Sequence, residues 1–374
     1  MVNSWDVVVV GGGPAGSATA SRLARKGHRV LLLDRARFPR RKPCGECVNP
    51  AGVEALGALG VLPAVEALGP ARLRGWRIGL SGGAAFSGDF PAERWGFGIP
   101  RERLDAVLLE HALASGAEVR MDAHVVELLR AGERVVGVRC ADGEEIRARV
   151  VVGADGLRSV VLRRLGLLRR VPRLRKLAFT AHVHGAGELD ERGELRVQGR
   201  SCVGVAPVGG GIANVVVVVP GGTEIEGDPQ GFFDGMMGQF GLRGVQRLDD
   251  VLATGPFDWP VRRAVADGAL LVGDAAGYYD PFTGQGIFRA LRGAELAAAT
   301  IHAALLRGDT SAAALMPYER QRKRAFGSGE RLQQLIEAVV SRPRLLAPAA
   351  GCLRRIPPVA NAVVRAAGDL GWAA

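Results

Sequence analysis

The chain has 374 residues, 48% of them hydrophobic, which is enough to bury a large core in one complex domain or two. Its net charge of +11 would suit binding to a nucleic acid. However, lysines are few, the arginines are scattered along the chain, and aromatic residues make up only 5%. We therefore expect no nucleic-acid partner, and we interpret the charge as an arginine-rich solvated surface that attracts acidic cofactors or anionic membranes. No stretch approaches the roughly 20 apolar residues of a membrane span, and the chain starts with a strand pattern instead of a signal region, which predicts a cytoplasmic location.

The cysteines and histidines predict neither a disulfide framework nor a metal site. Five cysteines are a sparse and odd-numbered set, which favours a reducing compartment. Cys44 and Cys47 form a C-x-x-C pair, but no second pair completes a zinc site. His182 and His184 alternate on one strand face, where we expect them to be exposed or packed and not bound to a metal.

The N-terminal segment carries the most informative motif. A buried-strand pattern runs directly into Gly11, Gly13 and Gly16, a G-x-G-x-x-G turn that precedes an alanine-rich helical pattern. Gly11 permits a tight turn, Gly13 leaves room for a pyrophosphate, and Gly16 lets helix and strand pack closely. The helix N-terminus offers N–H groups and a positive dipole end to the phosphates. A second apolar run ends at Asp34, which is placed to accept a hydrogen bond from a ribose hydroxyl, so residues 5–34 predict a dinucleotide-binding βαβ unit.

The middle of the chain alternates between extended and helical patterns. In chain order we expect an extended loop at 35–48, two short helices at 50–68, antiparallel strands at 72–90, a helix at 101–115, a hairpin at 125–140 and a buried strand at 146–152. The segment 177–257 is rich in strand patterns and contains one helix at 229–240. A further buried strand at 269–272 precedes a long alanine-rich helix from about residue 284. The basic remainder is expected to be helical and broken by Pro343, Pro348, Pro357 and Pro358.

Three glycine-and-acid clusters each follow a buried strand. They span residues 11–16, 153–156 and 273–277. Because ligands of open α/β sheets bind at the carboxyl ends of the strands, all three clusters can meet at one cofactor. A nicotinamide dehydrogenase needs only the first, so the pattern favours a larger cofactor that is held at its adenosine, its pyrophosphate and a distant ring.

These motifs resemble those of the flavoprotein superfamily that shares the p-hydroxybenzoate hydroxylase fold, and within it the geranylgeranyl reductase-related subgroup. The resemblance covers roughly residues 5–305 and implies FAD as the cofactor. It assigns FAD contacts to residues in five places along the chain. These are the fingerprint Gly11, Gly13, Gly16 and Asp34 with the adjacent Arg35, then Arg101, then Asp155 and Gly156, then Asp274 in Gly273-Asp274, and finally Gly284, Gln285, Gly286 and Ile287 in the motif that starts at Asp280.

A Pro-Cys-Gly loop around Cys44 favours the reductase-related subgroup, in which this loop lies close to the flavin and the substrate. The resemblance makes Cys44 the candidate catalytic residue, to protonate or position a substrate carbon, although a packing role is the alternative. Gly277 stands where aromatic hydroxylases of the superfamily carry His. Residues 201–207 lack the aromatic strand of geranylgeranyl reductases, which implies a differently shaped pocket. The segment from Trp95 to Pro100 matches the halogenase tryptophan motif only superficially and in the wrong place.

The predicted fold is mixed α/β with α+β elements. A discontinuous Rossmann-like FAD-binding domain would comprise residues 1–70, 97–172 and 258–308, with an inserted antiparallel β-sheet substrate domain at 71–96 and 173–257 and a helical region at 309–374. The basic C-terminal helices would either cover the substrate domain or contact a membrane surface.

We predict an FAD-dependent oxidoreductase that acts on an apolar isoprenoid- or polyketide-like molecule. Its reduced FAD, supplied by NADPH or a small electron carrier, would transfer a hydride to a carbon–carbon double bond near Cys44. The alternative is a monooxygenase that uses NAD(P)H and oxygen, since fold does not choose between these chemistries. An electron-transfer protein is disfavoured by the β-rich insertion, and a halogenase by the misplaced tryptophan motif.

Overall fold

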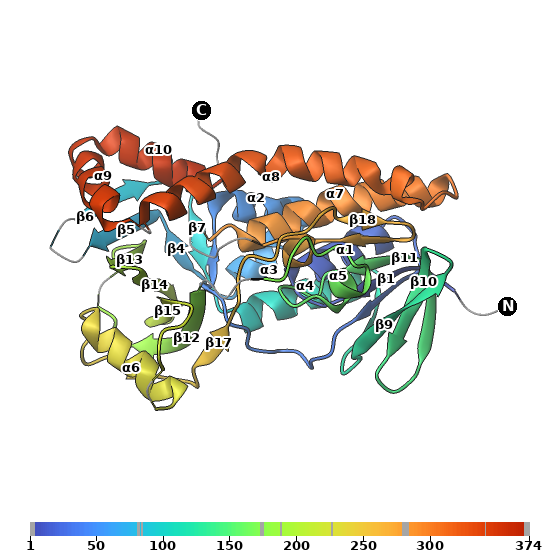
Figure 1. The fold of residues 1–374 in the computed structure, drawn as a ribbon, viewed down its shortest axis with the longest axis horizontal. Helices are drawn as coiled ribbons and strands as arrows, with labels where there is room; N and C mark the ends of the chain where they lie inside the picture. Colours follow the sequence, from blue (N-terminus) through green and yellow to red (C-terminus); the bar gives the residue numbers. More distant parts are fainter. Residues whose placement is uncertain are drawn as a thin grey trace.

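The computed structural model describes residues 4–80, 83, 85–172, 176–187, 189–225, 227–278, 284–340 and 342–369. Within these ranges the chain forms two eight-stranded sheets and one three-stranded sheet. Figure 1 shows the two large sheets at opposite ends of the molecule, with the long helix α8 (Ala312–Val340) running over both. The predicted mixed α/β fold is confirmed.

The cofactor sheet is a mostly parallel sheet with the strand order β18-β19-β11-β1-β2-β8, and the hairpin of β9 and β10 extends from β11. Its strands are β1 (Trp5–Val10), β2 (Val30–Leu33), β8 (Glu118–Arg120), β9 (Val125–Ala131), β10 (Arg134–Cys140), β11 (Glu145–Gly153), β18 (Val265–Ala266) and β19 (Ala269–Leu271). β1 pairs in parallel with β2 and β11, and β11 pairs in parallel with β19. The carboxyl ends of these strands therefore meet at one edge, where the three glycine clusters begin.

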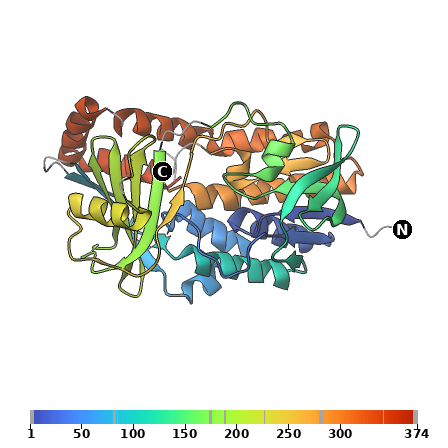
Figure 2. The same ribbon diagram turned by 60° about the horizontal axis from the view of Figure 1, so that its bottom comes forward.

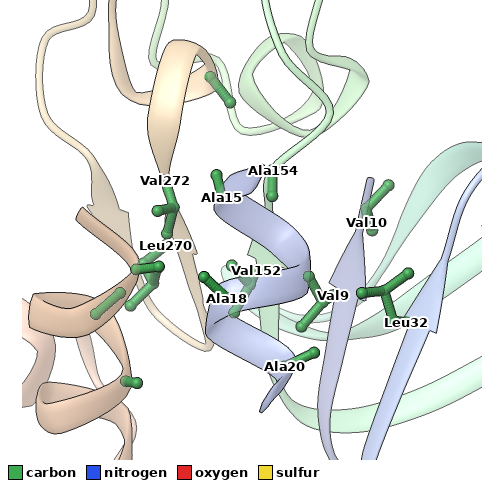
Figure 3. Packing of buried hydrophobic residues seen from close by; sticks show 14 of the residues in the cluster. Val9, Val10, Ala15, Ala18, Ala20, Leu32, Val152, Ala154, Leu270 and Val272 are labelled. Carbon is green, nitrogen blue, oxygen red and sulfur yellow. The ribbon is translucent and has the colours of Figure 1, made fainter. Parts of the chain in front are cut away.

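Helices cover this sheet because its central strands are apolar on both faces. They are α1 (Pro14–Ala24), α4 (Arg101–Ala114), α5 (Val160–Arg164), α7 (Gly286–Leu306) and α8, and the 3-10 turn η1 (Gly273–Ala276) follows β19. Figure 3 shows Ala15 and Ala18 of α1 packed among Val9, Val152 and Leu270. Such small side chains let α1 approach the strands closely, which brings its N-terminus to the sheet edge.

The second sheet, which we call the substrate sheet, has the order β16-β12-β15-β14-β13-β5-β6, with β17 beside β12. Its strands are β5 (Gly75–Leu80), β6 (Ala85–Asp89), β12 (Lys176–His184), β13 (Arg192–Gln198), β14 (Ser201–Gly209), β15 (Ile212–Pro220), β16 (Gln246–Arg247) and β17 (Leu252–Thr254). Its pairs are antiparallel except β13 with β5, which run in parallel. The strand β13 was not predicted.

The two faces of the substrate sheet follow the strand period of two. Phe179, Val203 and Val217 point to one face, where they pack in a cluster with Phe233 of α6 (Pro229–Gln239). The intervening Ala178 and Val218 line a cavity on the opposite face, toward the cofactor sheet. Figure 2, turned from the first view, shows α6 on the outer side of this sheet.

Short elements join the two large sheets. The three-stranded sheet consists of β3 (Cys47–Val48), β7 (Gly96–Gly98) and β4 (Ala71–Leu73), and it lies between β14 and the short helix α2. The expected pair of short helices is present as α2 (Pro50–Leu59) and α3 (Leu62–Glu66). The loop before β3 is thereby fixed at the boundary between the sheets.

The C-terminal region is helical, as predicted, with α9 (Pro343–Arg355) and α10 (Pro357–Ala367) after α8. One detail of the prediction was wrong, because α9 continues through Pro348. A proline inside a helix removes one i→i−4 hydrogen bond, and here that loss does not end the helix. Both α9 and α10 contact β6, so they cover the edge of the substrate sheet.

Candidate functional site

The first glycine cluster is shaped by contact between backbones. A Cβ on Gly11, whose φ is +104°, would lie 2.5 Å from the carbonyl oxygen of Ala154. A Cβ on Gly16 would lie 1.8 Å from the carbonyl oxygen of Gly11. Both positions require glycine because the turn after β1 is pressed between α1 and the end of β11.

Gly13 differs, because the space beside it is open. It is the N-cap of α1 and provides no side-chain cap for the helix N–H groups. Among the described residues, leaving out its chain neighbours, a Cβ placed there would have two atoms within 4 Å, Nη2 of Arg40 at 3.7 Å and Nη2 of Arg101 at 3.9 Å. A helix N-terminus faced by two guanidinium groups fits an anionic pyrophosphate.

Asp34 is buried at the end of β2 and holds the glycine turn. Its Oδ2 accepts a hydrogen bond from the Gly12 N–H at 2.7 Å and its Oδ1 accepts one from the Ala36 N–H at 2.8 Å. Arg40 lies 3.8 Å from the same carboxylate. The neighbouring Arg35 is exposed, so the structure brings Asp34 and not Arg35 against the glycine turn.

Arg101 begins α4 and is buried beside the same turn. Its guanidinium donates two hydrogen bonds to Asp105, both at 2.8 Å, and Arg40 lies 3.3 Å from that carboxylate. Burial alone would lower the pKa of Arg101, but Asp105 and the sulfur of Cys44 raise it, so the group stays charged. The aspartate thus orients a permanent positive charge at the cavity.

The two residues of the second cluster have different roles. Asp155 holds the start of a helix, and Gly156 lines the cavity. The Asp155 carboxylate accepts hydrogen bonds from the Ser159 hydroxyl at 2.5 Å and the Val160 N–H at 2.6 Å, which ties it to the start of α5. Burial raises the pKa of Asp155, and these hydrogen bonds oppose the shift. Gly156 lines the cavity, with Nζ of Lys42 3.2 Å from the position of a Cβ.

The third cluster places Asp274 in the same cavity. A Cβ on Gly273 would lie 2.9 Å from the Ala15 Cβ, so η1 and α1 approach closely. Burial raises the pKa of Asp274, while Lys42 opposes that shift. Burial lowers the pKa of Lys42, and the nearby Arg101 lowers it further. An acid and an amine on the wall of one cavity therefore influence each other's pKa.

The start of α7 contributes three of its four predicted residues to the cavity. Gly284, Gly286 and Ile287 line it. Gln285 turns away, because its Nε2 donates to Asp369 near the chain end at 2.8 Å and its Oε1 accepts from Arg289 at 2.8 Å. Residues 280–283 of this motif lie outside the described residues.

The cavity continues from the cofactor loops to an apolar wall on the substrate sheet. Its far wall comprises mainly small or apolar side chains, contributed by β5, β12, β13, β14 and β15, and these are Trp76, Ala178, Leu195, Cys202, Ala206, Val216 and Val218. Phe257 and Tyr278 add two aromatic rings, whose centroids are 5.9 Å apart. A cavity with a charged end and an apolar end suits a dinucleotide cofactor beside an apolar substrate.

Cys44 lies where these two parts meet. Its carbonyl oxygen accepts a hydrogen bond from Asn214 of β15 at 2.9 Å, and the Glu46 N–H donates to its Sγ at 3.3 Å. Asn214 in turn accepts from the Thr180 hydroxyl at 2.8 Å. Burial raises the pKa of the other cysteine in the motif, Cys47, which keeps it a thiol. The substrate sheet therefore fixes the Cys44 loop in place.

A charged network that the sequence analysis did not predict extends from this loop. Glu46 accepts the Arg101 N–H at 2.8 Å through Oε1 and lies 2.7 Å from Nε2 of His182 through Oε2. Asp249 lies 2.6 Å from Nδ1 of His182. Glu46 raises the pKa of His182 to about 9 against the opposing effect of burial, with a further contribution from Asp249. The alternation of His182 and His184 was visible in the sequence, but nothing there distinguished the half-buried His182 from the exposed His184.

Three glycine loops on one cavity, at the carboxyl edge of a parallel sheet and beside a second sheet, define a flavin-dependent oxidoreductase. The chain belongs to the FAD binding domain family, whose model matches residues 4–328, and FAD is its cofactor. The expected resemblance to the geranylgeranyl reductase-related subgroup is confirmed by the relatives.

Two relatives and one solved structure illustrate this membership. The chain is 31% identical over 338 residues to the digeranylgeranylglycerophospholipid reductase of Methanothrix thermoacetophila, a match that covers 86% of this chain and 84% of that protein. It is 31% identical over 314 residues to the menaquinone reductase of Mycobacterium tuberculosis, covering 79% and 76%. The flavin-dependent brominase Bmp2 superposes with a TM-score of 0.85 over 99% of this chain and 96% of that chain, and at 22% identity this likeness shows the shared fold.

Among the helices that the structure describes, none is long and apolar enough to cross a bilayer.

Proposed function

We propose that the protein uses FAD to reduce a carbon–carbon double bond of an isoprenoid or similarly apolar molecule. The observation that carries this proposal is the position of Cys44, on a cavity that the cofactor loops share with the apolar wall of the substrate sheet. The names of the two relatives, reductases of a geranylgeranyl lipid and of menaquinone, favour this substrate class. In this proposal residues 71–96 and 173–257 form the substrate domain.

The cofactor would lie along the cavity from the glycine turn to the start of α7. Gly11 and Gly16 shape the turn, Gly13 and the α1 N-terminus would receive the pyrophosphate, and Asp34 would bind the adenosine ribose, with Arg35 at its exposed side. Arg101 and Asp274 would contact the cofactor between its phosphates and its ring. Gly284, Gly286 and Ile287 would place helix N–H groups at the ring, where negative charge increases on reduction. Asp155 and Gln285 would act indirectly, by holding α5 and α7.

When bound and reduced, FAD supplies a hydride to the substrate. The chain's own task is to orient the double bond and to provide the proton that the second carbon needs. Cys44 is the candidate for this proton donor, because its thiol lies on the cavity beside Arg101 and is held by the Glu46 N–H. We propose NADPH or a small electron carrier as the reductant.

The test compares Cys44→Ala with wild type and with a matched Cys352→Ala variant, whose cysteine is exposed on α9. We expect all three proteins to be purified yellow, and only Cys44→Ala to turn over digeranylgeranylglycerophospholipid at least about tenfold more slowly. Mass spectrometry would detect products that have gained two hydrogen atoms per reduced double bond. Unchanged turnover in Cys44→Ala would remove this residue from the mechanism.

The rival function on the same scaffold is hydroxylation with NAD(P)H and oxygen. This reaction differs from reduction in its use of oxygen, because one oxygen molecule is consumed for each product molecule. Product formation under strict anaerobiosis supports reduction, whereas oxygen uptake that matches product formation would favour the hydroxylase.

We also propose peripheral membrane contact through α9 and α10, since an isoprenoid lipid resides in a bilayer. Leu345, Ile356 and Val359 are exposed there, and Arg354 and Arg355 lie beside them. Co-sedimentation with anionic but not with zwitterionic vesicles would support the contact. A variant with Ile356→Asp and Val359→Asp should lose it.

A further inference from the structure

Glu46, His182 and Asp249 form a continuous chain between the cavity and the protein surface. The two contacts are 2.7 Å, from Glu46 Oε2 to His182 Nε2, and 2.6 Å, from His182 Nδ1 to Asp249 Oδ2. Side-chain exposure increases along the chain, from 6% for Glu46 through 14% for His182 to 23% for Asp249. Glu46 lines the cavity, and its own N–H contacts the sulfur of Cys44.

We propose that Asp249, His182 and Glu46 are a proton relay, which carries a proton from solvent to the cavity wall beside Cys44. The inference rests on the proposed function, because each reduced double bond takes up one hydride and one proton. The hydride brings both electrons, so the relay transfers protons only.

The proton balance of one turnover is as follows. The Cys44 S–H bond breaks as its proton joins the substrate carbon, and the sulfur retains the electron pair. His182 passes its Nε2 proton to Glu46 Oε2, and the Glu46 carboxyl restores the Cys44 thiol across the cavity surface that both residues line. The ring keeps its Nδ1 proton, so the nitrogen to be reprotonated is Nε2. The ring turns to bring Nε2 to Asp249, takes up one solvent proton there, and returns doubly protonated to its place between the two carboxylates. Nothing but one solvent proton is consumed.

The surroundings keep a proton available on this histidine. Its two carboxylate neighbours raise the pKa of His182 to about 9, so the ring is protonated near neutral pH. Three arginines contact this chain. Arg41 lies 2.9 Å from Asp249, Arg247 donates to the Asp249 carbonyl oxygen at 3.0 Å, and the Arg101 N–H binds Glu46 Oε1. Arg41 and the Arg101 N–H thus hold the two carboxylates beside the ring, and Arg247 holds the Asp249 backbone.

A purely structural role, in which the network only fastens the Cys44 loop to β12, makes different predictions. The variants Glu46→Gln and Asp249→Asn preserve shape and hydrogen-bonding capacity but cannot transfer a proton as a carboxylic acid does. The chain offers two matched controls on the same elements, His184→Gln on β12 and Asp250→Asn next to Asp249, since both native residues are exposed.

The experiment is a single-turnover measurement under anaerobic conditions. Each FAD-loaded protein is reduced with dithionite, which makes the reductant's identity irrelevant, and mixed with digeranylgeranylglycerophospholipid in H₂O and in D₂O. FAD content and the melting temperature are measured alongside, so that loss of cofactor or fold is recognised. The rate of flavin oxidation is the main readout.

We expect Glu46→Gln and Asp249→Asn to oxidise at least about tenfold more slowly while retaining FAD, and both controls to match wild type. The wild-type rate should be lower in D₂O, and Glu46→Gln should change that isotope effect. Variants within twofold of wild type, with the same isotope effect, would overturn the relay and leave the reductase intact. If Glu46→Gln loses FAD, the more exposed Asp249→Asn decides the question. A wild-type protein that does not reduce the lipid overturns the proposed function and the relay together.

Discussion

Replacing Gly13 by valine is expected to abolish FAD binding without unfolding the protein. The Gly13 φ of −75° and ψ of −172° are accessible to any L-residue. In the part of the chain that the structure describes, an added Cβ would meet, beyond its chain neighbours, two flexible arginine nitrogens, at 3.7 and 3.9 Å. The valine methyl groups would instead fill the space at the α1 N-terminus. If two charge-assisted hydrogen bonds to the pyrophosphate are lost, at about 1.5–3 kcal/mol each, the Kd for FAD rises by about 10² to 10⁴.

The assay titrates apoprotein with FAD and follows quenching of flavin fluorescence, while circular dichroism reports the melting temperature of the apoprotein. Gly235→Val is the matched control, because Gly235 is exposed on α6 and an added Cβ there meets nothing within 4 Å. Gly16→Ala gives the opposite contrast, since its Cβ would lie 1.8 Å from the Gly11 oxygen. That substitution should lower the melting temperature of the apoprotein itself.

The reasoning is refuted if Gly13→Val binds FAD with wild-type affinity, since the pyrophosphate would then lie elsewhere. It is also refuted if the apoprotein melts well below wild type, since the space beside Gly13 would then be needed by the fold.

Two further predictions concern stability and can be read from urea unfolding curves. The Tyr318 hydroxyl is fully buried and donates to the Leu271 carbonyl oxygen at 2.8 Å, so Tyr318→Phe should cost about 1–3 kcal/mol by leaving that oxygen unsatisfied. Folding raises the pKa of His182 from about 6.5 to about 9. Its contribution to the free energy of unfolding is therefore fully present below pH 6.5 and is lost as the pH rises toward 9. The loss of stability amounts to roughly 3 kcal/mol. His182→Gln should remove this part of the pH dependence. If stability depends on pH in the variant as it does in wild type, the pKa of the ring does not change on folding.

The cofactor half of the fold could be predicted because its signals are local. A buried run of β-branched residues, glycines where backbones touch and an acid at the end of the next strand all lie within residues 5–34, and the structure forms β1, α1 and β2 there. The strand β13 was missed for two reasons. Its sequence pattern is polar, and one of its two neighbours in the sheet, β5, is far away in the chain, while the other is β14. The direction of the Gln285 side chain is likewise set by Asp369, 84 residues away.

The network at Glu46 shows the same limit within the site. Its partners His182 and Asp249 are separated by 67 residues, and His182 is 136 residues from Glu46. No period or motif connects such positions, because their contact depends on how the substrate sheet packs against the cofactor loops. Cys44 could be singled out only by resemblance, whereas Glu46 and its contact with His182 needed the fold.

The cavity contains aromatic rings although the strand at residues 201–207 lacks them. Residues 201–207 lack aromatic side chains, which implied a pocket unlike that of geranylgeranyl reductases, yet Trp76, Phe257 and Tyr278 bring three rings to the cavity from other elements. The small residues Cys202 and Ala206 of β14 line the same cavity as those rings and Cys44. Burying a hydrocarbon chain there would contribute about 0.8 kcal/mol for each methylene removed from water. Burial of the hydrocarbon chain does not discriminate between headgroups. Substrate selection must therefore depend on which double bond reaches Cys44 and on the charged residues around it.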